Sequence, residues 1–311
     1  MLAVASSAGA QASAPLVIAL TPERVGERSW YFRGEAGMAS AANRGFMSNA
    51  GFVVTREGVV VFDALGTPAL GRGMVDAIRK VTDQPIRRVV VSHYHADHVY
   101  GLQPLKTAGA EIWAHRRSLD YFASGAAAER LVQRRADLFP WVDETTELVK
   151  PDVLVDGDTA FRMGGVDFRI IDTGGAHAPD DIMMLVEGER TLYAGDLLFA
   201  GRIPFVGNAD SAHWLAAIER LIPIGPAVVV PGHGPASRDV ARDLATTRDY
   251  LAYLRETMGR AARDLEPFDD AYAKTDWTRF RSLPAFEPAN RINAWGTYLR
   301  IEQETLDAGR P

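Results

Sequence analysis

The chain has 311 residues, 47% of them hydrophobic and 24% charged, which is an ordinary composition for a folded protein with a sizeable core in one large domain or two small ones. A net charge of −6 argues against nucleic acid or an anionic membrane surface as the partner. The chain contains no cysteine, which excludes both a disulfide framework and a thiolate-ligated metal site.

The first 14 residues, MLAVASSAGAQASA, are small and apolar and contain two small-x-small steps before Pro15. This pattern is typical of the end of a secretory signal with its cleavage site, although no basic n-region is present and the apolar core is short. We therefore expect a periplasmic or secreted protein, and treat residues 1–14 as a leader outside the fold. A flexible Ala/Ser leader on a cytoplasmic protein is the alternative. No run of eighteen apolar residues occurs, so no membrane span is predicted.

Two β-rich runs over residues 48–55 and 59–63 are separated by Arg56-Glu57-Gly58, which predicts a hairpin. Asp63 closes the second strand. It is either a turn former or an acceptor that orients a metal-ligating histidine. Leu16-Val17-Ile18 is interpreted as a further short strand.

Thr67-Pro68 opens a predicted helix whose apolar residues recur at three- and four-residue spacing as far as Val81. The next apolar run, residues 86–92, predicts a buried strand. It ends directly in the sequence His93-Tyr94-His95-Ala96-Asp97-His98.

That polar cluster holds three of the seven histidines within six positions. Protonated imidazoles this close would repel each other, whereas neutral imidazole and carboxylate are ligands for a cation. The cluster therefore predicts a metal site at the end of the strand. A polar loop that happens to contain histidine is the alternative.

Helices are predicted over 102–108 and 119–138, with a short strand over 110–115 between them, and His115 is interpreted as structural. Strands resume over 153–155, 159–163 and 166–171, separated by Asp-Gly and Gly-Gly turns.

Three later strands also end in loops that carry His or Asp. The strand over 166–171 runs into a Gly-rich loop with His177, the strand over 191–194 leads to Asp196, and the strand over 227–230 leads to His233. Successive strand ends lie along one edge of a sheet, where ligands bind. We therefore expect these side chains to converge with the first cluster.

The remaining sequence is mostly helical. Helices are predicted over 211–222 and 238–265, and an aromatic tail follows. We expect a catalytic domain over 15–237 and a C-terminal helical extension over 238–311 that packs on it.

The ordered set of seven side chains resembles the metallo-β-lactamase superfamily over Ser48 to Pro235. The resemblance implies an α/β fold, a four-layer αβ/βα sandwich with the site along one edge of two sheets, and two metal ions, usually zinc. The ligands that it implies are His93, His95 and His177 for the first metal, Asp97, His98 and His233 for the second, and Asp196 as the bridging carboxylate.

Asp63 matches the strand-end aspartate that supports the site loops in this superfamily. The Ser-His-Tyr-His-Ala-Asp-His loop and the Leu-Pro-x-Phe-Glu…Asn-Ala tail look most similar to the periplasmic SoxH-like, quinoprotein-associated zinc hydrolases, whose substrate we do not assign. Two positions depart from the broader pattern. Asp196 stands where many β-lactamases of this fold have Cys or Ser, and Asp180 replaces the Gly that often follows Pro179.

We therefore expect a dinuclear zinc hydrolase that cleaves an ester, lactone, thioester or amide bond, β-lactams included, in a small-molecule substrate. A metal-bridging hydroxide would attack the carbonyl, with Asp97 holding it and shuttling its proton. Arg202 is interpreted either as a receptor for a substrate carboxylate or as a surface residue. Tyr94 and Tyr193 are interpreted either as oxyanion donors or as packing residues.

The residues alone leave three other functions possible. A mononuclear iron dioxygenase acting on a thiol or persulfide needs only two histidines and one carboxylate. A nuclease of the same fold would need an inserted nucleic-acid domain and a basic groove, and neither is evident. A complete ligand set is also compatible with a non-catalytic metal or ligand binder.

Overall fold

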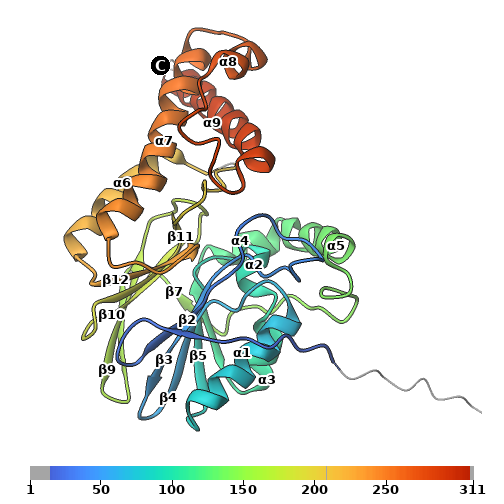
Figure 1. The fold of residues 1–311 in the computed structure, drawn as a ribbon, viewed down its shortest axis with the longest axis vertical. Coiled ribbons are helices and arrows are strands. Elements are labelled where there is room, and N and C mark those ends of the chain that lie inside the picture. The colour runs from blue at the N-terminus through green and yellow to red at the C-terminus, as the bar shows by residue number, and fades with distance from the viewer. Residues whose placement is uncertain (1–14, 208, 309–311) are drawn as a thin grey trace, which may run out of the picture.

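The computed structural model describes residues 15–207 and 209–308, so the predicted leader over 1–14 lies outside the described part. Two β-sheets stack face to face, and helices cover the outer face of each (Figure 1). The predicted four-layer αβ/βα architecture, with a C-terminal helical region, is confirmed.

The first sheet has seven strands in the order β1-β2-β3-β4-β5-β6-β7. Their bounds are Glu23–Arg24, Ser29–Phe32, Ala50–Thr55, Gly58–Phe62, Ile86–Val90, Glu111–His115 and Val153–Val155. The predicted hairpin is β3–β4, and β4, β5, β6 and β7 run parallel. The strand predicted over 16–18 is wrong. The Ile18 N–H donates to the Ala69 carbonyl of the first helix (3.2 Å), so this segment lies along a helix instead of pairing with a sheet.

The second sheet has five strands in the order β12-β11-β10-β9-β8. Their bounds are, from β8 to β12, Thr159–Met163, Val166–Asp172, Ile182–Val186, Thr191–Phe199 and Val228–His233. β11 is longer than predicted because it continues past Ala194 through an irregular register at Gly195, whose φ is 53°. Asp196 therefore lies within β11 itself, which is an inner strand of the sheet.

Three apolar cores separate the four layers, and single strands contribute to two of them. In β4, Val59 and Val61 face the core beneath the first helices, whereas Val60 and Phe62 face the core between the sheets. A strand buried on both faces needs an unbroken apolar run, which is what the sequence supplies. The third core lies between the second sheet and the C-terminal helices.

The helices of the first half are α1, α2, α3, α4 and α5, with bounds Pro68–Val81, Ala96–Val99, Leu102–Thr107, Ser118–Ala123 and Ala126–Leu138. The Thr67 hydroxyl accepts from the Leu70 N–H and caps α1, and Pro68 occupies the first turn, where no N–H is needed. Gly125, with φ 79°, separates α4 from α5 within the segment predicted to be helical, where the sequence already indicated that Gly125 bounds or breaks the helix. α4 and α5 lie near the edge of the sheets that carries the site (Figure 1).

The helices of the second half are α6, α7, α8 and α9, with bounds Ser211–Leu221, Val240–Arg263, Phe268–Lys274 and Phe286–Ala308, and a 3₁₀ turn over Ile222–Ile224 follows α6. α6 and α7 pack on β11, and α9 packs on α7 (Figure 1). Asn293 of α9 accepts from the Val206 N–H (2.7 Å) and donates to the Pro204 carbonyl (2.8 Å). The C-terminal region thereby fixes the loop that follows β11. Within the described residues, no helix has the length and hydropathy to cross a membrane.

Candidate metal centre

Side chains from both sheets meet at one edge of the sandwich. The loop after β5 supplies His93 and His95, and the short helix α2 supplies Asp97 and His98. The β9–β10 loop supplies His177. Asp196 comes from β11 and His233 from the end of β12. All seven predicted ligands thus lie in two adjacent groups, and in each group the candidate ligand atoms lie within 4.8 Å of one another.

The first group places three ring nitrogens around one point. His95 Nδ1 lies 2.9 Å from His93 Nε2 and 3.0 Å from His177 Nε2. The Asp196 Oδ2 atom lies 3.3 Å from His177 Nε2 and 4.0 Å from His93 Nε2. This group therefore offers three nitrogens and one oxygen.

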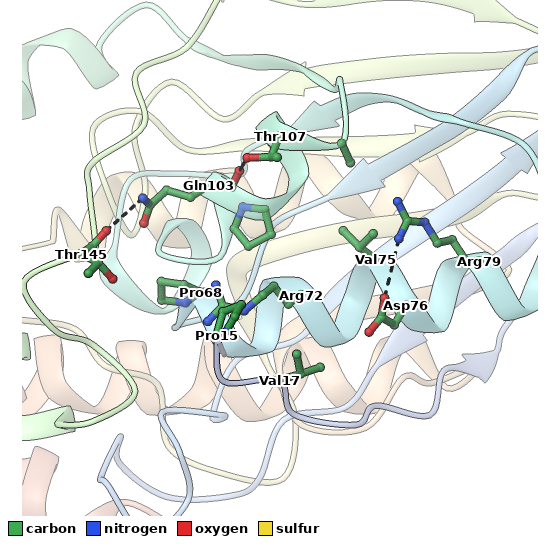
Figure 2. A pocket seen from close by; sticks show the side chains of 12 residues that line it. Pro15, Val17, Pro68, Arg72, Val75, Asp76, Arg79, Gln103, Thr107 and Thr145 are labelled. Carbon is green, nitrogen blue, oxygen red and sulfur yellow. Dashed lines mark hydrogen bonds and ion pairs between the residues drawn. The ribbon is translucent and has the colours of Figure 1, made fainter. Parts of the chain in front are cut away.

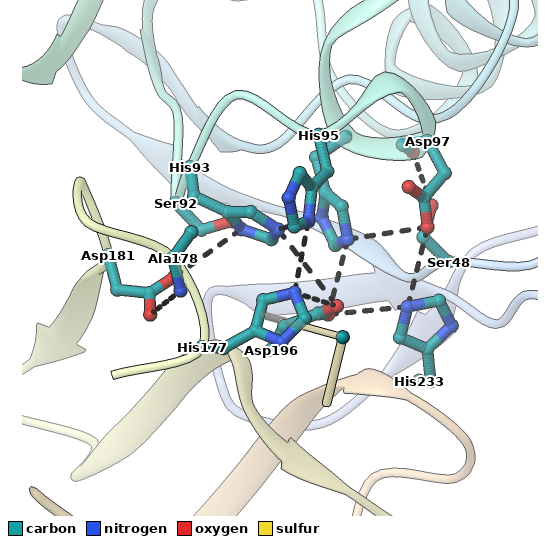
Figure 3. Close-up of polar contacts among 12 residues, drawn as sticks. Ser48, Ser92, His93, His95, Asp97, His177, Ala178, Asp181, Asp196 and His233 are labelled. Carbon is teal, nitrogen blue, oxygen red and sulfur yellow. Dashed lines mark hydrogen bonds and ion pairs between the residues drawn. The ribbon is translucent and has the colours of Figure 1, made fainter. Parts of the chain in front are cut away.

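The second group contains Asp97, His98 and His233. Asp97 Oδ2 lies 3.5 Å from His98 Nε2 and 3.4 Å from His233 Nε2. The other oxygen of Asp196, Oδ1, lies 3.2 Å from His98 Nε2 and 3.3 Å from His233 Nε2. The Asp196 carboxylate thus stands between the groups and directs one oxygen to each (Figure 3).

Hydrogen bonds on the far side of three rings fix which nitrogen carries the proton. His98 Nδ1 lies 2.8 Å from Asp63 Oδ2, and His233 Nδ1 lies 2.8 Å from the Met47 carbonyl. Both partners only accept, so Nδ1 is the donor and the neutral ring presents a lone pair at Nε2. The Ser92 hydroxyl donates to Asp63 (2.8 Å) and therefore accepts from His93 Nδ1 (2.9 Å), which leaves the His93 Nε2 lone pair in the same orientation.

This arrangement fits bound cations. Lone pairs on imidazole nitrogens face one another and face carboxylate oxygens, which is repulsive unless a positive charge stands between them. The buried atoms His98 Nε2 and Asp196 Oδ1 lie 3.2 Å apart without forming a well-aligned hydrogen bond, which fits atoms that bind a metal. Imidazole and carboxylate donors suit zinc, and a thiolate is not required.

The pKa shifts describe the same charge balance in the protein alone. Burial and the neighbouring histidines lower the pKa of His93 well below its ordinary value, and burial lowers the pKa of His177 to about 3. Burial also lowers the pKa of His98, but the carboxylates around it, Asp196 first, outweigh burial and raise it well above its ordinary value. The first group therefore holds neutral imidazoles ready to bind a cation, while the second group gathers positive charge next to carboxylates.

Asp63 organises the base of the site. Its carboxylate accepts from the Ser92 N–H (2.7 Å), the Ser92 hydroxyl (2.8 Å) and His98 Nδ1 (2.8 Å). Of the two roles open from the sequence, this geometry supports the acceptor that orients ligating histidines.

Two supporting residues were not singled out by the sequence analysis. Asp181 accepts from the N–H groups of Ala176 (3.3 Å) and Ala178 (2.6 Å), which flank His177 and hold its loop. Asn49 donates to the carbonyls of Pro231 (2.7 Å) and Gly234 (2.8 Å) on either side of His233. Each follows or precedes a strand, but polar residues at strand ends are too common to reveal such partners.

The residues predicted to contact substrate lie in different environments. Arg202 is buried, with 2% of its surface exposed, so the surface role is wrong. Its Nη1 donates to the Gly37 carbonyl (2.8 Å) and lies 3.5 Å from His233 Nδ1. The Tyr94 hydroxyl donates to the Val149 carbonyl (2.9 Å), and that of Tyr193 lies 3.0 Å from the Trp30 carbonyl, so both rings are packing residues in this structure.

A cavity of about 600 Å³ opens onto the first group, and the His95 and His177 rings form part of its wall. A second hollow, of about 520 Å³, lies between the segment after Pro15, α1 and α3 (Figure 2). Of the seven ligand residues, none lines this second hollow, so substrate access to the metal centre is assigned to the first cavity.

A family model described as Metallo-beta-lactamase superfamily matches residues 43–233, more than half of the chain and the whole ligand set. The chain belongs to the metallo-beta-lactamase superfamily.

Curated relatives are distant. A linear primary-alkylsulfatase from Pseudomonas sp. (strain ATCC 19151) is 25% identical over 237 residues, which cover 64% of this chain and 44% of the relative. A hydroxyacylglutathione hydrolase from Francisella tularensis subsp. novicida is 25% identical over 58% of this chain and 64% of its own length. This chain thus spans less than two thirds of either relative. A metallo-beta-lactamase type 2 from Bacillus sp. (strain 170) is 25% identical over 66% of this chain and 70% of the relative.

Solved structures agree on the fold. A metallo-beta-lactamase from Pontibacter korlensis covers 75% of this chain and 99% of its own, with a TM-score of 0.60 and 22% identity. A stereoselective inverting sec-alkylsulfatase from Pseudomonas sp. covers 90% of this chain and 50% of its own, with a TM-score of 0.69 and 19% identity.

Proposed function

We propose that this protein is a dinuclear zinc hydrolase. The observation that carries the proposal is the Asp196 carboxylate, which directs Oδ2 to the group of His93, His95 and His177 and Oδ1 to the group of Asp97, His98 and His233. A mononuclear iron dioxygenase would use the first group alone. It would leave the second group, with its two oriented imidazoles, unexplained.

Two bound zinc ions would supply a water made nucleophilic at neutral pH and would polarise the bond to be cleaved. The protein's part is to hold the two groups at fixed separation. Asp63, Ser92 and the Met47 carbonyl set the tautomers of three rings, so these rings need no reorganisation before they bind a metal.

Asp97 is the residue proposed to orient the attacking water and to accept its proton. Its carboxylate lies between His98 and His233, and its side chain is 18% exposed, in contrast to the enclosed Asp196. The interaction with His98 keeps the pKa of Asp97 far below its ordinary value despite burial, so the group is ionised at neutral pH. An ionised carboxylate on the solvent side can accept a hydrogen bond from the attacking water and so orient it.

The proposed bonds are an ester, lactone, thioester or amide, β-lactams included. The relatives include a hydroxyacylglutathione hydrolase and metallo-beta-lactamases, which supports acyl-group hydrolysis. A sulfate ester is the second candidate. It is supported by the linear primary-alkylsulfatase that matches 64% of this chain at 25% identity.

The test is metal content together with a substrate panel on the purified full chain. We expect two zinc ions per chain, and turnover of at least one lactone, thioester, aryl ester, β-lactam or alkyl sulfate. Chelation should abolish this turnover and added zinc should restore it. Stoichiometric iron with oxygen uptake on a thiol or persulfide would favour the dioxygenase, and metal binding without turnover of any panel member would favour a non-catalytic binder.

We also propose that the protein is exported, on the basis of the small-x-small steps before Pro15. Expression of the full chain in a Gram-negative host, followed by fractionation and N-terminal sequencing, tests this. Periplasmic protein that begins near residue 15 is expected, and uncleaved cytoplasmic protein would contradict it.

A further inference from the structure

The cavity at the metal centre is lined by basic side chains in a protein whose net charge is −6. Three arginines and one further histidine line it, against a single carboxylate. The basic residues are Arg117, Arg130, Arg300 and His213, and the carboxylate is Asp210.

Two of these arginines lack a counter-charge. Arg300 is paired with Asp210 and Glu304, which neutralises that side of the cavity. Arg117 and Arg130 form no ion pair with any carboxylate in residues 15–207 and 209–308. The neighbouring Arg116, by contrast, pairs with Asp156 at 2.9 Å.

Both arginines are placed by the parts of the fold that build the site. Arg117 precedes α4, and its Nη1 lies 3.4 Å from the Gly174 carbonyl and 3.5 Å from the Pro179 carbonyl, the two ends of the loop that carries His177. Arg130, on α5, lines the same cavity as His95, and its Nη1 donates to Gln133 Oε1 on the same helix (3.4 Å). The guanidinium groups of Arg117 and Arg130 therefore contribute positive charge to the cavity beside the first group of ligands.

The cavity also has apolar lining. Phe205 and Val206 come from the loop after β11, and Ile292 comes from α9 with 52% of its surface exposed. The cavity therefore combines a positive wall, an apolar wall and the candidate ligands His95 and His177.

We infer that this site takes a substrate that carries an oxyanion group (a carboxylate, sulfate or phosphate) in addition to the bond that is cleaved. The oxyanion binds Arg117 and Arg130, the apolar part of the substrate lies against Phe205 and Ile292, and the scissile bond reaches the His95 side of the metal centre. A guanidinium binds such oxyanions through two parallel hydrogen bonds, so the two arginines select for charge as well as position. The inference rests on the proposed hydrolase function and names its substrate class.

The catalytic test compares a matched pair of esters, 4-nitrophenyl hydrogen glutarate, which is anionic, and 4-nitrophenyl butyrate, which is neutral. The wild-type chain should favour the anionic ester in kcat/KM by about tenfold or more, because its carboxylate forms charge-assisted hydrogen bonds that the neutral ester cannot form. In the R117A/R130A variant this preference should disappear, mainly through KM, and lysines at both positions should restore part of it. The R116A variant is the matched control, because Arg116 is adjacent and exposed but paired with Asp156, and it should keep the wild-type preference.

A binding test separates this inference from the proposed function. Saturation-transfer NMR with monomethyl glutarate on the chelated, metal-free full chain should give a signal that falls severalfold in R117A/R130A and is unchanged in R116A. If this pattern appears but no member of the substrate panel is hydrolysed by the zinc-loaded chain, the anion site stands and the hydrolase proposal fails. If esters are hydrolysed with no preference for the anion, the inference is overturned and the hydrolase proposal stands. If wild type and R117A/R130A give equal or no NMR signals, the inference is overturned, and turnover of the panel alone decides the hydrolase proposal.

Discussion

The two ligand groups of the candidate centre are held in different ways. In the second group, the rings of His98 and His233 each donate from Nδ1 to a fixed acceptor, the Asp63 carboxylate and the Met47 carbonyl. In the first group, the buried His177 Nδ1 has no hydrogen-bond partner among the described residues, and His95 is only partly buried. In the second group the two rings are thus enclosed and oriented by hydrogen bonds, while Asp97 is partly exposed. The first group depends on the loop fixed by Asp181 and faces the cavity.

Because of this difference, the two groups are suited to different roles. The enclosed group is suited to hold a cation in constant geometry, and the open group is suited to meet a substrate. Asp196 links them, because each of its oxygens serves one group. The predictions below test that division, beginning with the residue that both groups share.

Replacing Asp196 with alanine should have the largest effect, because it removes an oxygen ligand from both groups. We expect zinc content to fall well below two per chain and hydrolysis to drop by about a thousandfold or more. Elemental analysis and steady-state kinetics measure both. The D167A variant, which removes an exposed carboxylate of β9 paired with Arg162, serves as the control and should behave as wild type. Two zinc ions retained in D196A would contradict a shared carboxylate.

Removing one histidine from each group should sharpen the comparison. H177A takes a nitrogen from the first group and H233A takes one from the second, so each variant should retain about one zinc and lose about a hundredfold or more in kcat/KM. Replacing zinc with cobalt should then give two different visible spectra, because the retained metal has different donors in the two variants. They are Asp97, His98, His233 and Asp196 in H177A, and His93, His95, His177 and Asp196 in H233A. Identical spectra would mean that one metal position serves both groups.

Changing Asp63 to asparagine should act on the enclosed group first. His98 loses its charged acceptor directly, while His93 is affected only through Ser92. We expect zinc affinity at the second group to fall roughly 10–100-fold, with a smaller change at the first. Competition with a chromophoric chelator measures both affinities, and an equal loss at both groups would show that Asp63 does not distinguish them.

The smallest expected effect concerns the loop of the open group. Burial raises the pKa of Asp180 to about 6, and its carboxylate accepts from the Tyr94 N–H (3.1 Å). The folded pKa lies above the unfolded value of about 3.9, so ionisation above pH 6 costs folding free energy that is regained as the pH falls towards 4. Urea unfolding should therefore show D180N to be more stable than wild type at pH 7, by up to about 2–3 kcal/mol, with the difference vanishing near pH 4. A difference that does not change with pH would contradict this.

The sequence allowed metal ligands to be predicted where a histidine or aspartate follows the end of a predicted strand. His93, His177, Asp196 and His233 could be singled out because each follows or ends an apolar run, and because histidine and aspartate in that position point to a metal. The fold followed from the same alternation of strands and from the family pattern. In the structure, all seven predicted ligands converge in two adjacent groups.

The walls of the cavity could not be predicted in the same way. Arg117 stands next to Arg116 just before α4, and Arg130 lies on α5, which is rich in arginine. Only the packing of these segments beside the His177 loop separates the two residues from Arg116. Arg202 looked equally suited to the surface because burial of a guanidinium depends on distant partners such as the Gly37 carbonyl. Local pattern carries no information on such contacts.

The most direct measurement is a crystal structure of the zinc-loaded full chain with anomalous diffraction recorded at the zinc edge. The account predicts two anomalous peaks per chain, one between Asp196 and the rings of His93, His95 and His177, and one between Asp196 and Asp97, His98 and His233. A single peak, or peaks away from Asp196, would contradict a centre built on a carboxylate that serves two metals.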